Sequence, residues 1–278
     1  MADVFDDYWD ELEDDEKNLF DEMSEIISDN WLAVASVISF FYLYNIKNDT
    51  IKYNTFMQRA SNEEKRYVKK LMRKYGKSDL YKTSDVKGAK INVLKIAIDV
   101  TEEVGAKGMS AALEKHFSEM ATRVDKYIKN KYDIKSDGKV KLPNIYKNQL
   151  ANSQKVSNKL FEELKSGIIK GERYQDISET LKKGYEKRSL SDVKKIVRTE
   201  GTAVTNAVGL EMFKEEGYTE YKYSSVIDSR TTEICRSLDG NVFKISQAER
   251  GVNFPPMHVN CRSGFEIVMG KQNVDSAV

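Results

Sequence analysis

Across most of the chain, apolar side chains recur at the spacing of a helix face. Between residues 5 and 29 they recur at steps of three and four among acidic ones, which predicts an amphipathic helix. The same spacing predicts a helix over Ser110–Lys131. Before it, Lys90–Val104 is rich in apolar residues, and we expect this segment to be interrupted at Gly105 and Gly108.

Glycines and a serine set the expected limits of the later helices. Asn144–Gly171 is predicted as a helix that ends at its glycine, and Glu172–Lys187 as a shorter one. A new helix is expected from Ser189, because serine can cap a helix start and an acid three residues later suits the positive end of the helix dipole. It would run to about Glu216 and stop at Gly217.

Beyond residue 217 the pattern changes to that of short strands. Alternating tyrosines next to the β-branched pair Val226-Ile227 favour a strand, and Asp239-Gly240 favours a turn. The runs Asn241–Ile245 and Gly264–Met269 favour two more strands. The predicted fold class is therefore α+β, mostly α, with a helical N-terminal body and a small C-terminal α+β module that contains a short antiparallel sheet.

A polar stretch at 133–144, which contains Pro143, is the expected linker or hairpin. The predicted domains are a helical arm or body at 1–143 and a second domain at 144–270, followed by a disordered tail at 271–278. A length of 278 residues agrees with two domains, or with one domain and an extended arm.

Charge is unevenly distributed along the chain, although its net value is only +1. Residues 1–30 carry thirteen Asp or Glu and one Lys, whereas Ile46–Lys95 holds fourteen Lys or Arg against five Asp or Glu. Such a contrast suggests electrostatic partners or a contact between the two segments. Tyrosines interleaved with the basic residues are compatible with non-specific DNA contact. The simpler interpretation is that most of these charged residues lie on solvated helix faces and contact no partner.

The apolar segment 30–48 has no charge between Asp29 and Lys47. It is about as long as the shortest membrane helices, which need about 17–25 residues, but two serines and an asparagine favour a buried or partner-facing helix, and no stable membrane span is expected. The acidic N-terminus has no secretory pattern. Two cysteines make no disulfide framework, so synthesis in a reducing cytoplasm is expected.

Rare residue types gather near the C-terminus, where both cysteines and one of the two histidines lie. Cys235, His258 and Cys261 have the chemistry of zinc ligands, and Asp228, Asp239 or a water could be the fourth ligand. The competing interpretation is that the cysteines are small buried hydrophobic residues and that His258 hydrogen-bonds a loop backbone.

Arginine and carboxylate residues flank these candidate ligands. Arg198 and Glu200 lie within a helical pattern, Arg230 and Arg262 bracket the cysteine loop, and Asp228 precedes it. A buried arginine–carboxylate network would tie the helix to the strand and the loop. For any one of these arginines and carboxylates, the alternative is that it lies on an exposed polar face and belongs to no network. No phosphate-binding loop, dinucleotide-binding, serine-hydrolase or zinc-protease motif is present in the sequence.

The C-terminal half resembles the phage Mu F-like family of minor head proteins, or phage head morphogenesis proteins, from about residue 150 to 268. The resemblance is carried by Leu164–Gly167, Asp176-Ile-Ser, Arg198-Thr-Glu200, Asn206, Asp228-x-Arg230-Thr231, Cys235-x-x-Leu238-Asp239-Gly240 and Pro255-Pro256-x-His258-x-Asn260-Cys261-Arg262. Two family cysteines are absent, because Thr232 and Ser263 stand in their places. The loop can therefore hold by packing and hydrogen bonds.

This resemblance implies a minor capsid protein of a tailed bacteriophage or prophage. It would associate with the portal protein, and with scaffold or major capsid protein as further partners, and would enter the procapsid in few copies. Its place would be the virion interior near the portal, reached from the host cytoplasm during assembly, and it would aid head assembly and DNA delivery. No catalytic residue is expected.

An enzyme is the alternative, because domains of this family are sometimes fused to toxin modules. Tyr223-Ser224-Ser225 after a helix that carries Arg198 has a faint similarity to an ADP-ribosyltransferase pattern. The Glu-x-Glu that such an enzyme requires is not found downstream. A metal-dependent toxin is the other form of this alternative.

Overall fold

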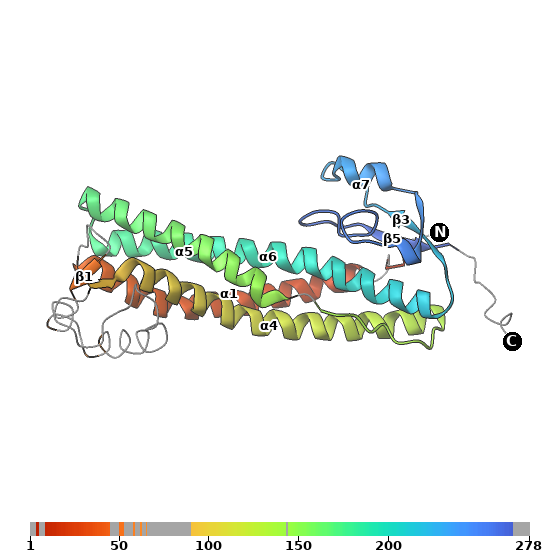
Figure 1. Cartoon of the computed structure of the whole chain (residues 1–278), viewed down its shortest axis with the longest axis horizontal. Helices are drawn as coiled ribbons and strands as arrows, with labels where there is room; N and C mark the ends of the chain where they lie inside the picture. Colours follow the sequence, from red (N-terminus) through yellow and green to blue (C-terminus); the bar gives the residue numbers. More distant parts are fainter. Residues whose placement is uncertain are drawn as a thin grey trace. The chain divides into compact units, whose positions relative to one another are not determined.

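Long helices make up most of the fold, and a small antiparallel sheet lies near the C-terminus (Figure 1). The computed structural model describes residues 4–5, 9–44, 50–52, 58, 62, 65, 90–142 and 144–268. Its long helices are α1 (Trp9–Tyr44), α4 (Val93–Tyr132), α5 (Ile145–Lys170) and α6 (Tyr174–Glu215). The predicted α+β, mostly α, fold class is confirmed.

The chain forms two compact units, and each unit joins segments that are distant in sequence. One unit consists of Met1–Glu22, Ala111–Ile145 and Asp192–Val278, and the other of Met23–Ser110 and Tyr146–Ser191. We call them the sheet unit and the helical unit. Both take residues from either side of position 143, so the division into domains at 143 and 270 stays a prediction.

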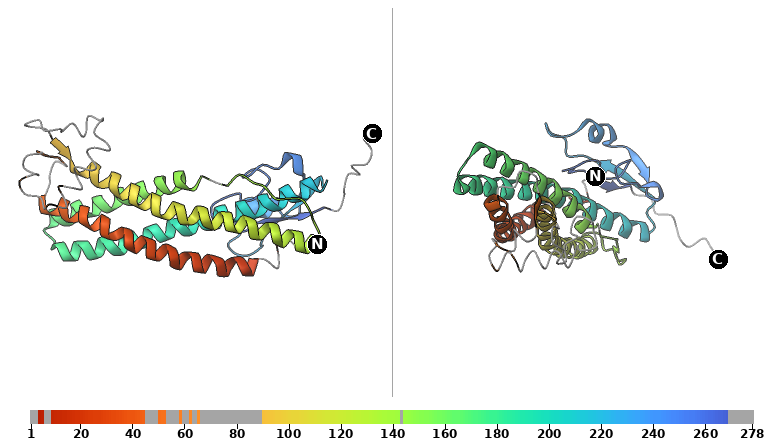
Figure 2. Two further views of the ribbon diagram at one scale, coloured as in Figure 1. Left: turned by 90° about the horizontal axis from the view of Figure 1, so that it is seen from below. Right: turned by 60° about the vertical axis from the view of Figure 1, so that its left-hand side comes forward.

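Within the helical unit, successive helices run side by side in alternating directions (Figure 2). Their close approach depends on small residues. A Cβ added at Gly105 of α4 would lie 2.8 Å from the Ser153 hydroxyl of α5, and one at Gly167 would lie 2.9 Å from Ile177 of α6. Strands β1 (Thr50–Lys52) and β2 (Lys90–Asn92) pair antiparallel in the same unit.

An aromatic core organises the sheet unit. Phe265 contacts the rings of Phe5, Phe213, Tyr221 and Phe254, with centroid separations of 5.6–6.3 Å. The Phe5 and Phe265 side chains have no exposed surface. Burial of aromatic area at this density is a major stabilising contribution, and it joins α6, the sheet and residues 4–5.

The sheet has three antiparallel strands in the order β4-β3-β5. They are β3 (Glu220–Ser224), β4 (Val242–Lys244) and β5 (Gly264–Ile267). Tyr221 and Tyr223 of the central strand are buried, whereas the residues between and beside them are partly exposed. This alternation matches the predicted tyrosine pattern. The neighbouring pair Val226-Ile227 lies just beyond the end of this strand.

One predicted helix boundary is wrong. Ser189 was expected to start a new helix, but α6 continues through it without a break. Ser189 is only 6% exposed, and the neighbouring Tyr185 is buried against Trp31 with ring centroids 5.6 Å apart. Burial of this face favours a continuous helix over a local cap. The predicted ends at Gly171 and Gly217 are confirmed, since both glycines adopt positive φ just beyond a helix.

A second boundary is also wrong, because α4 runs through Gly105 and Gly108. The close approach of Ser153 to Gly105 gives the physical reason: a glycine there is needed for helix packing rather than for a break. Residues 133–142 contain neither helix nor strand, which agrees with a linker between α4 and α5 and not with a hairpin.

Two other predictions fall wholly or partly outside the described residues. The apolar segment 30–48 is helical as far as Tyr44, and 45–48 lie outside. No helix in the described parts of the chain combines the length and the apolar character that a membrane crossing requires. Most of Ile46–Lys95 and the tail 271–278 also lie outside the described residues.

Candidate functional site

The candidate site is built on the short helix α7 (Glu233–Leu238) and on the loop that precedes β5. Turn residues hold α7 against the central strand. Gly240 has φ of +77° and donates its N–H to the Tyr223 carbonyl, and Asp239 accepts the N–H of Ser225 at 2.8 Å. Positive φ explains why a glycine stands at this turn.

Asp228 is the centre of a hydrogen-bonded turn. Both of its carboxylate oxygens lie 2.8 Å from one guanidinium nitrogen of Arg262, and it also accepts the backbone N–H of Arg230 at 2.8 Å. The hydroxyl of Thr231 accepts the Asp228 N–H. The Arg262 side chain, then the Arg230 backbone, hold the pKa of Asp228 well below its usual range. The pair between Asp228 and Arg262 thus connects the turn after β3 to the loop before β5, which carries Cys261 and is called the cysteine loop below.

Three side chains of α6 hydrogen-bond to the backbone of the same loop. The Thr202 hydroxyl donates to the Cys261 carbonyl at 2.8 Å, and the Asn206 amide donates to the Ser263 carbonyl at 3.2 Å. The Thr199 hydroxyl accepts the N–H of Asn260 at 3.0 Å. Asn206 has no exposed surface, so its hydrogen bond to the loop is buried.

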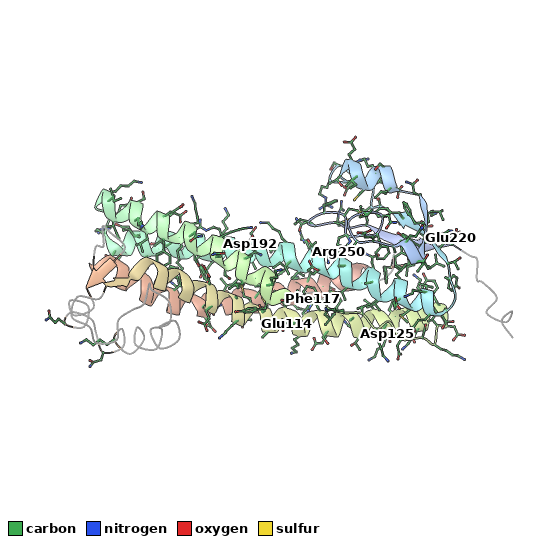
Figure 3. All side chains as sticks on the ribbon, in the orientation of Figure 1. Glu114, Phe117, Asp125, Asp192, Glu220 and Arg250 are labelled. Carbon is green, nitrogen blue, oxygen red and sulfur yellow. The ribbon has the colours of Figure 1, made fainter. Side chains whose placement is uncertain are left out.

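A bidentate ion pair connects α6 to the segment after β4. Both terminal nitrogens of Arg250, labelled beside α6 in Figure 3, donate to the Glu200 carboxylate at 2.9 and 3.0 Å. Glu200 is buried on the helix. Arg198 is exposed instead and forms an ion pair with Glu16 at 3.6 Å. The predicted arginine–carboxylate network therefore exists as separate pairs, and Glu200 binds an arginine that the sequence did not single out.

Cys235, His258 and Cys261, the three candidate zinc ligands, lie close together in the structure. Their ligand atoms all lie within 4.8 Å of one another. The Cys235 sulfur is 3.2 Å from His258 Nε2 and 3.9 Å from the Cys261 sulfur. Both cysteines are free and buried, and His258 is half-buried. We refer to these three residues as the thiol–imidazole cluster.

Neighbouring polar side chains lower the pKa of the Cys235 thiol. Burial disfavours the thiolate, but the neighbouring side chains of Thr232, Ser263, Tyr223 and His258 outweigh that effect and lower the pKa of Cys235 to about 7. The Tyr223 hydroxyl lies 3.5 Å from the sulfur. Burial in turn raises the pKa of Tyr223, so this hydroxyl stays a donor. The cluster is chemically suited to thiolate formation near neutral pH.

Asp228 and Asp239 do not join the thiol–imidazole cluster among the described residues. Their carboxylates serve the turns around α7 instead. Pro256 follows a cis peptide bond and is buried, and Asn260 adopts φ of +60°, a conformation that asparagine tolerates better than most residues. These positions shape the loop and contribute no ligand atom to the cluster.

Sequence reasoning missed several residues that build the site, namely Thr199, Thr202, Tyr223 as a thiol neighbour, Arg250 and Ser263. The two threonines lie three residues apart on α6, on either side of Glu200. A helix face with polar residues at this spacing in an otherwise apolar stripe is the signal that could have identified them.

Comparison with known proteins identifies one family. Residues 158–266 match the model of a family described as Phage Mu protein F like protein. No curated protein and no solved structure matches the chain. The matched segment begins within α5 and ends in β5, so it includes the thiol–imidazole cluster and every polar tie that holds the loop.

Proposed function

Residues 158–266 belong to the Phage Mu protein F like family, and from this we propose that the chain is a minor head protein that associates with the portal and aids DNA delivery. The family description names a phage protein, which agrees with the resemblance to phage head morphogenesis proteins. The match in residues 158–266 is the observation that carries the proposal. Association with the portal, few copies in the procapsid and a position inside the virion extend it.

The construction of the site supports a binding role. The polar groups of the site are used within the fold. Asp228 pairs with Arg262, Glu200 pairs with Arg250, and the Asn206 amide donates to the Ser263 carbonyl. Such ties fix the shape of a surface. In the same unit, four aliphatic side chains remain 44–52% exposed on the turn after β3, on α7 and on β4: Val226, Ile227, Ile234 and Val242. We take this aliphatic patch as the part of the sheet unit to test for partner contact.

The enzyme alternative gains no support from the family match. The hydroxyl of Ser225 donates to the Cys235 carbonyl at 2.8 Å, and Arg198 pairs with Glu16. Tyr223 is buried in the sheet unit. Arg198, Tyr223 and Ser225, which had suggested an ADP-ribosyltransferase, thus contact other residues of the sheet unit.

Particle composition tests the proposal. Procapsids and DNA-filled virions of the encoding phage or induced prophage would be purified on gradients, and the chain quantified against the portal protein by mass spectrometry. We expect the chain in both particles at a few copies each, and its loss from procapsids assembled without portal. Presence in the lysate together with absence from both particles would contradict a head protein. Incorporation that does not depend on the portal would contradict the association alone.

Two surface variants test the aliphatic patch. Ile227→Asp combined with Ile234→Asp places charge where a partner would bury apolar area, and it should reduce incorporation. The control is Val252→Asp, a change at a position that is 59% exposed and lies outside the patch. Equal incorporation of both variants and the native chain would remove the patch from the interface.

A further inference from the structure

The geometry of the thiol–imidazole cluster points to a metal site, and we propose that Cys235, His258 and Cys261 bind one zinc ion whose fourth ligand is water. This inference does not depend on the proposed function. Two segments contribute, since Cys235 lies on α7 and the other two residues lie on the loop before β5. The chain has only these two cysteines.

The distances fit three corners of a zinc tetrahedron. With Zn–S of about 2.3 Å and Zn–N of about 2.0–2.1 Å, neighbouring ligand atoms lie about 3.5–3.8 Å apart. The observed separations are 3.2 Å from the Cys235 sulfur to His258 Nε2 and 3.9 Å between the two sulfurs. The remaining pair lies within 4.8 Å. Small side-chain rotations therefore suffice to bind the ion.

The orientation of His258 is an independent observation that indicates a ligand. Its Nδ1 lies 2.9 Å from the carbonyl oxygen of Val259. A carbonyl can only accept a hydrogen bond, so Nδ1 carries the proton and Nε2 presents its lone pair toward the Cys235 sulfur. A backbone carbonyl that fixes the tautomer in this way is the usual support of a metal-bound histidine.

The ligand backbones are already held in place. The Cys235 carbonyl accepts the Ser225 hydroxyl and the Asp239 N–H. The Cys261 carbonyl accepts the Thr202 hydroxyl. Held backbones reduce the entropy that binding would cost. An ion would then cross-link the six-residue helix α7 to the cysteine loop.

Ligand chemistry selects the metal. Two thiolates and one imidazole favour zinc over magnesium or calcium, which prefer oxygen ligands. Among the described residues, no fourth His, Cys, Asp or Glu joins the cluster. Three protein ligands leave one position for water, which distinguishes this site from a closed four-ligand structural site.

Metal content of the full chain tests the proposal. The protein would be purified with a thiol reductant and no chelator, then analysed by plasma mass spectrometry. We expect about one zinc per chain, and at least a five-fold loss in Cys261→Ser and in His258→Gln. The matched control is His116→Gln, which removes the only other histidine and lies outside the cluster. Asp228→Asn should keep its zinc, because the Asp228 carboxylate binds Arg262.

Cobalt substitution keeps the test decisive if a variant fails to fold. Native protein stripped by a chelator and titrated with Co²⁺ should show thiolate-to-cobalt charge transfer and intense visible bands, saturating at about one equivalent, as tetrahedral coordination requires. Stripping should lower Tm, and added zinc should restore it. Absence of both zinc and the cobalt spectrum would overturn the proposal. So would a native mass two hydrogens short, which would show that Cys235 and Cys261 form a disulfide.

Discussion

Asp228 shows how one carboxylate can make loop stability depend on pH. Its pKa is held well below the usual range by Arg262 and by the Arg230 backbone, whereas in the unfolded chain it returns to about 3.9. A depressed folded pKa contributes stability above the unfolded pKa, and this contribution is lost as pH falls toward the folded value. We expect Asp228→Asn to be less stable than the native chain at pH 7.

The difference between these two proteins should shrink as pH falls below about 4. Urea unfolding of both, measured from pH 7 down to pH 3 by circular dichroism, gives the difference at each pH. A difference that stays constant over this range would show that the Asp228 charge does not contribute to stability.

Gly209 and Gly201 test close packing on α6. A Cβ added at Gly209 would lie 2.8 Å from the Phe5 ring and 3.1 Å from Ile128, so Gly209→Ala should destabilise by about 1–3 kcal/mol through overpacking. At Gly201 the nearest atom would be 3.5 Å away. Gly201→Ala should therefore be neutral or stabilise by up to about 1 kcal/mol through helix propensity. Thermal unfolding measures both variants, and equal effects would contradict the packing difference.

At the scale of elements, the pair between Glu200 and Arg250 attaches the segment after β4 to α6. The Glu200 side chain is 11% exposed, so Arg250→Ala would leave a carboxylate nearly buried and unpaired. We expect a loss of about 1–3 kcal/mol. The control is Lys183→Ala, whose partner Glu179 is 70% exposed and whose loss should have little effect on stability.

A double-mutant cycle with Glu200→Gln isolates the interaction. The Arg250→Ala change should cost much less in the Glu200→Gln background, since no charge is then left buried. Additive effects of the two substitutions would mean that the pair does not couple α6 to this segment.

Helix α6 also shows what local signals predict about elements. Its end at Gly217 and the end of α5 at Gly171 follow from the conformation of single residues, and sequence predicted both. The false start at Ser189 came from a local cap pattern. Because Ser189 and Tyr185 are buried by packing, a long-range contact overrode a local preference.

At the scale of the molecule, residues far apart in sequence complete one core. Phe5 has no exposed surface and lies 6.1 Å from the Phe265 ring, and the Val4 N–H donates to the Phe265 carbonyl. Phe5→Ala should cost about 3–5 kcal/mol and increase amide exchange in β5. Val252→Ala, a change at a 59% exposed position, should have little effect. Unchanged exchange in β5 of Phe5→Ala would contradict this role of the N-terminal residues.

By itself, the sequence determined the features that depend on local spacing and on residue chemistry. Helical periodicity, glycine helix ends and alternating tyrosines predicted an α+β fold that is mostly α, and the Cys and His types identified three candidate ligands. Tertiary structure alone decided which carboxylate meets which arginine, because Glu200 and Arg250 are fifty residues apart. It also placed Asp228 on Arg262 rather than in the thiol–imidazole cluster. Such pairings depend on how distant segments pack, and no local pattern specifies them.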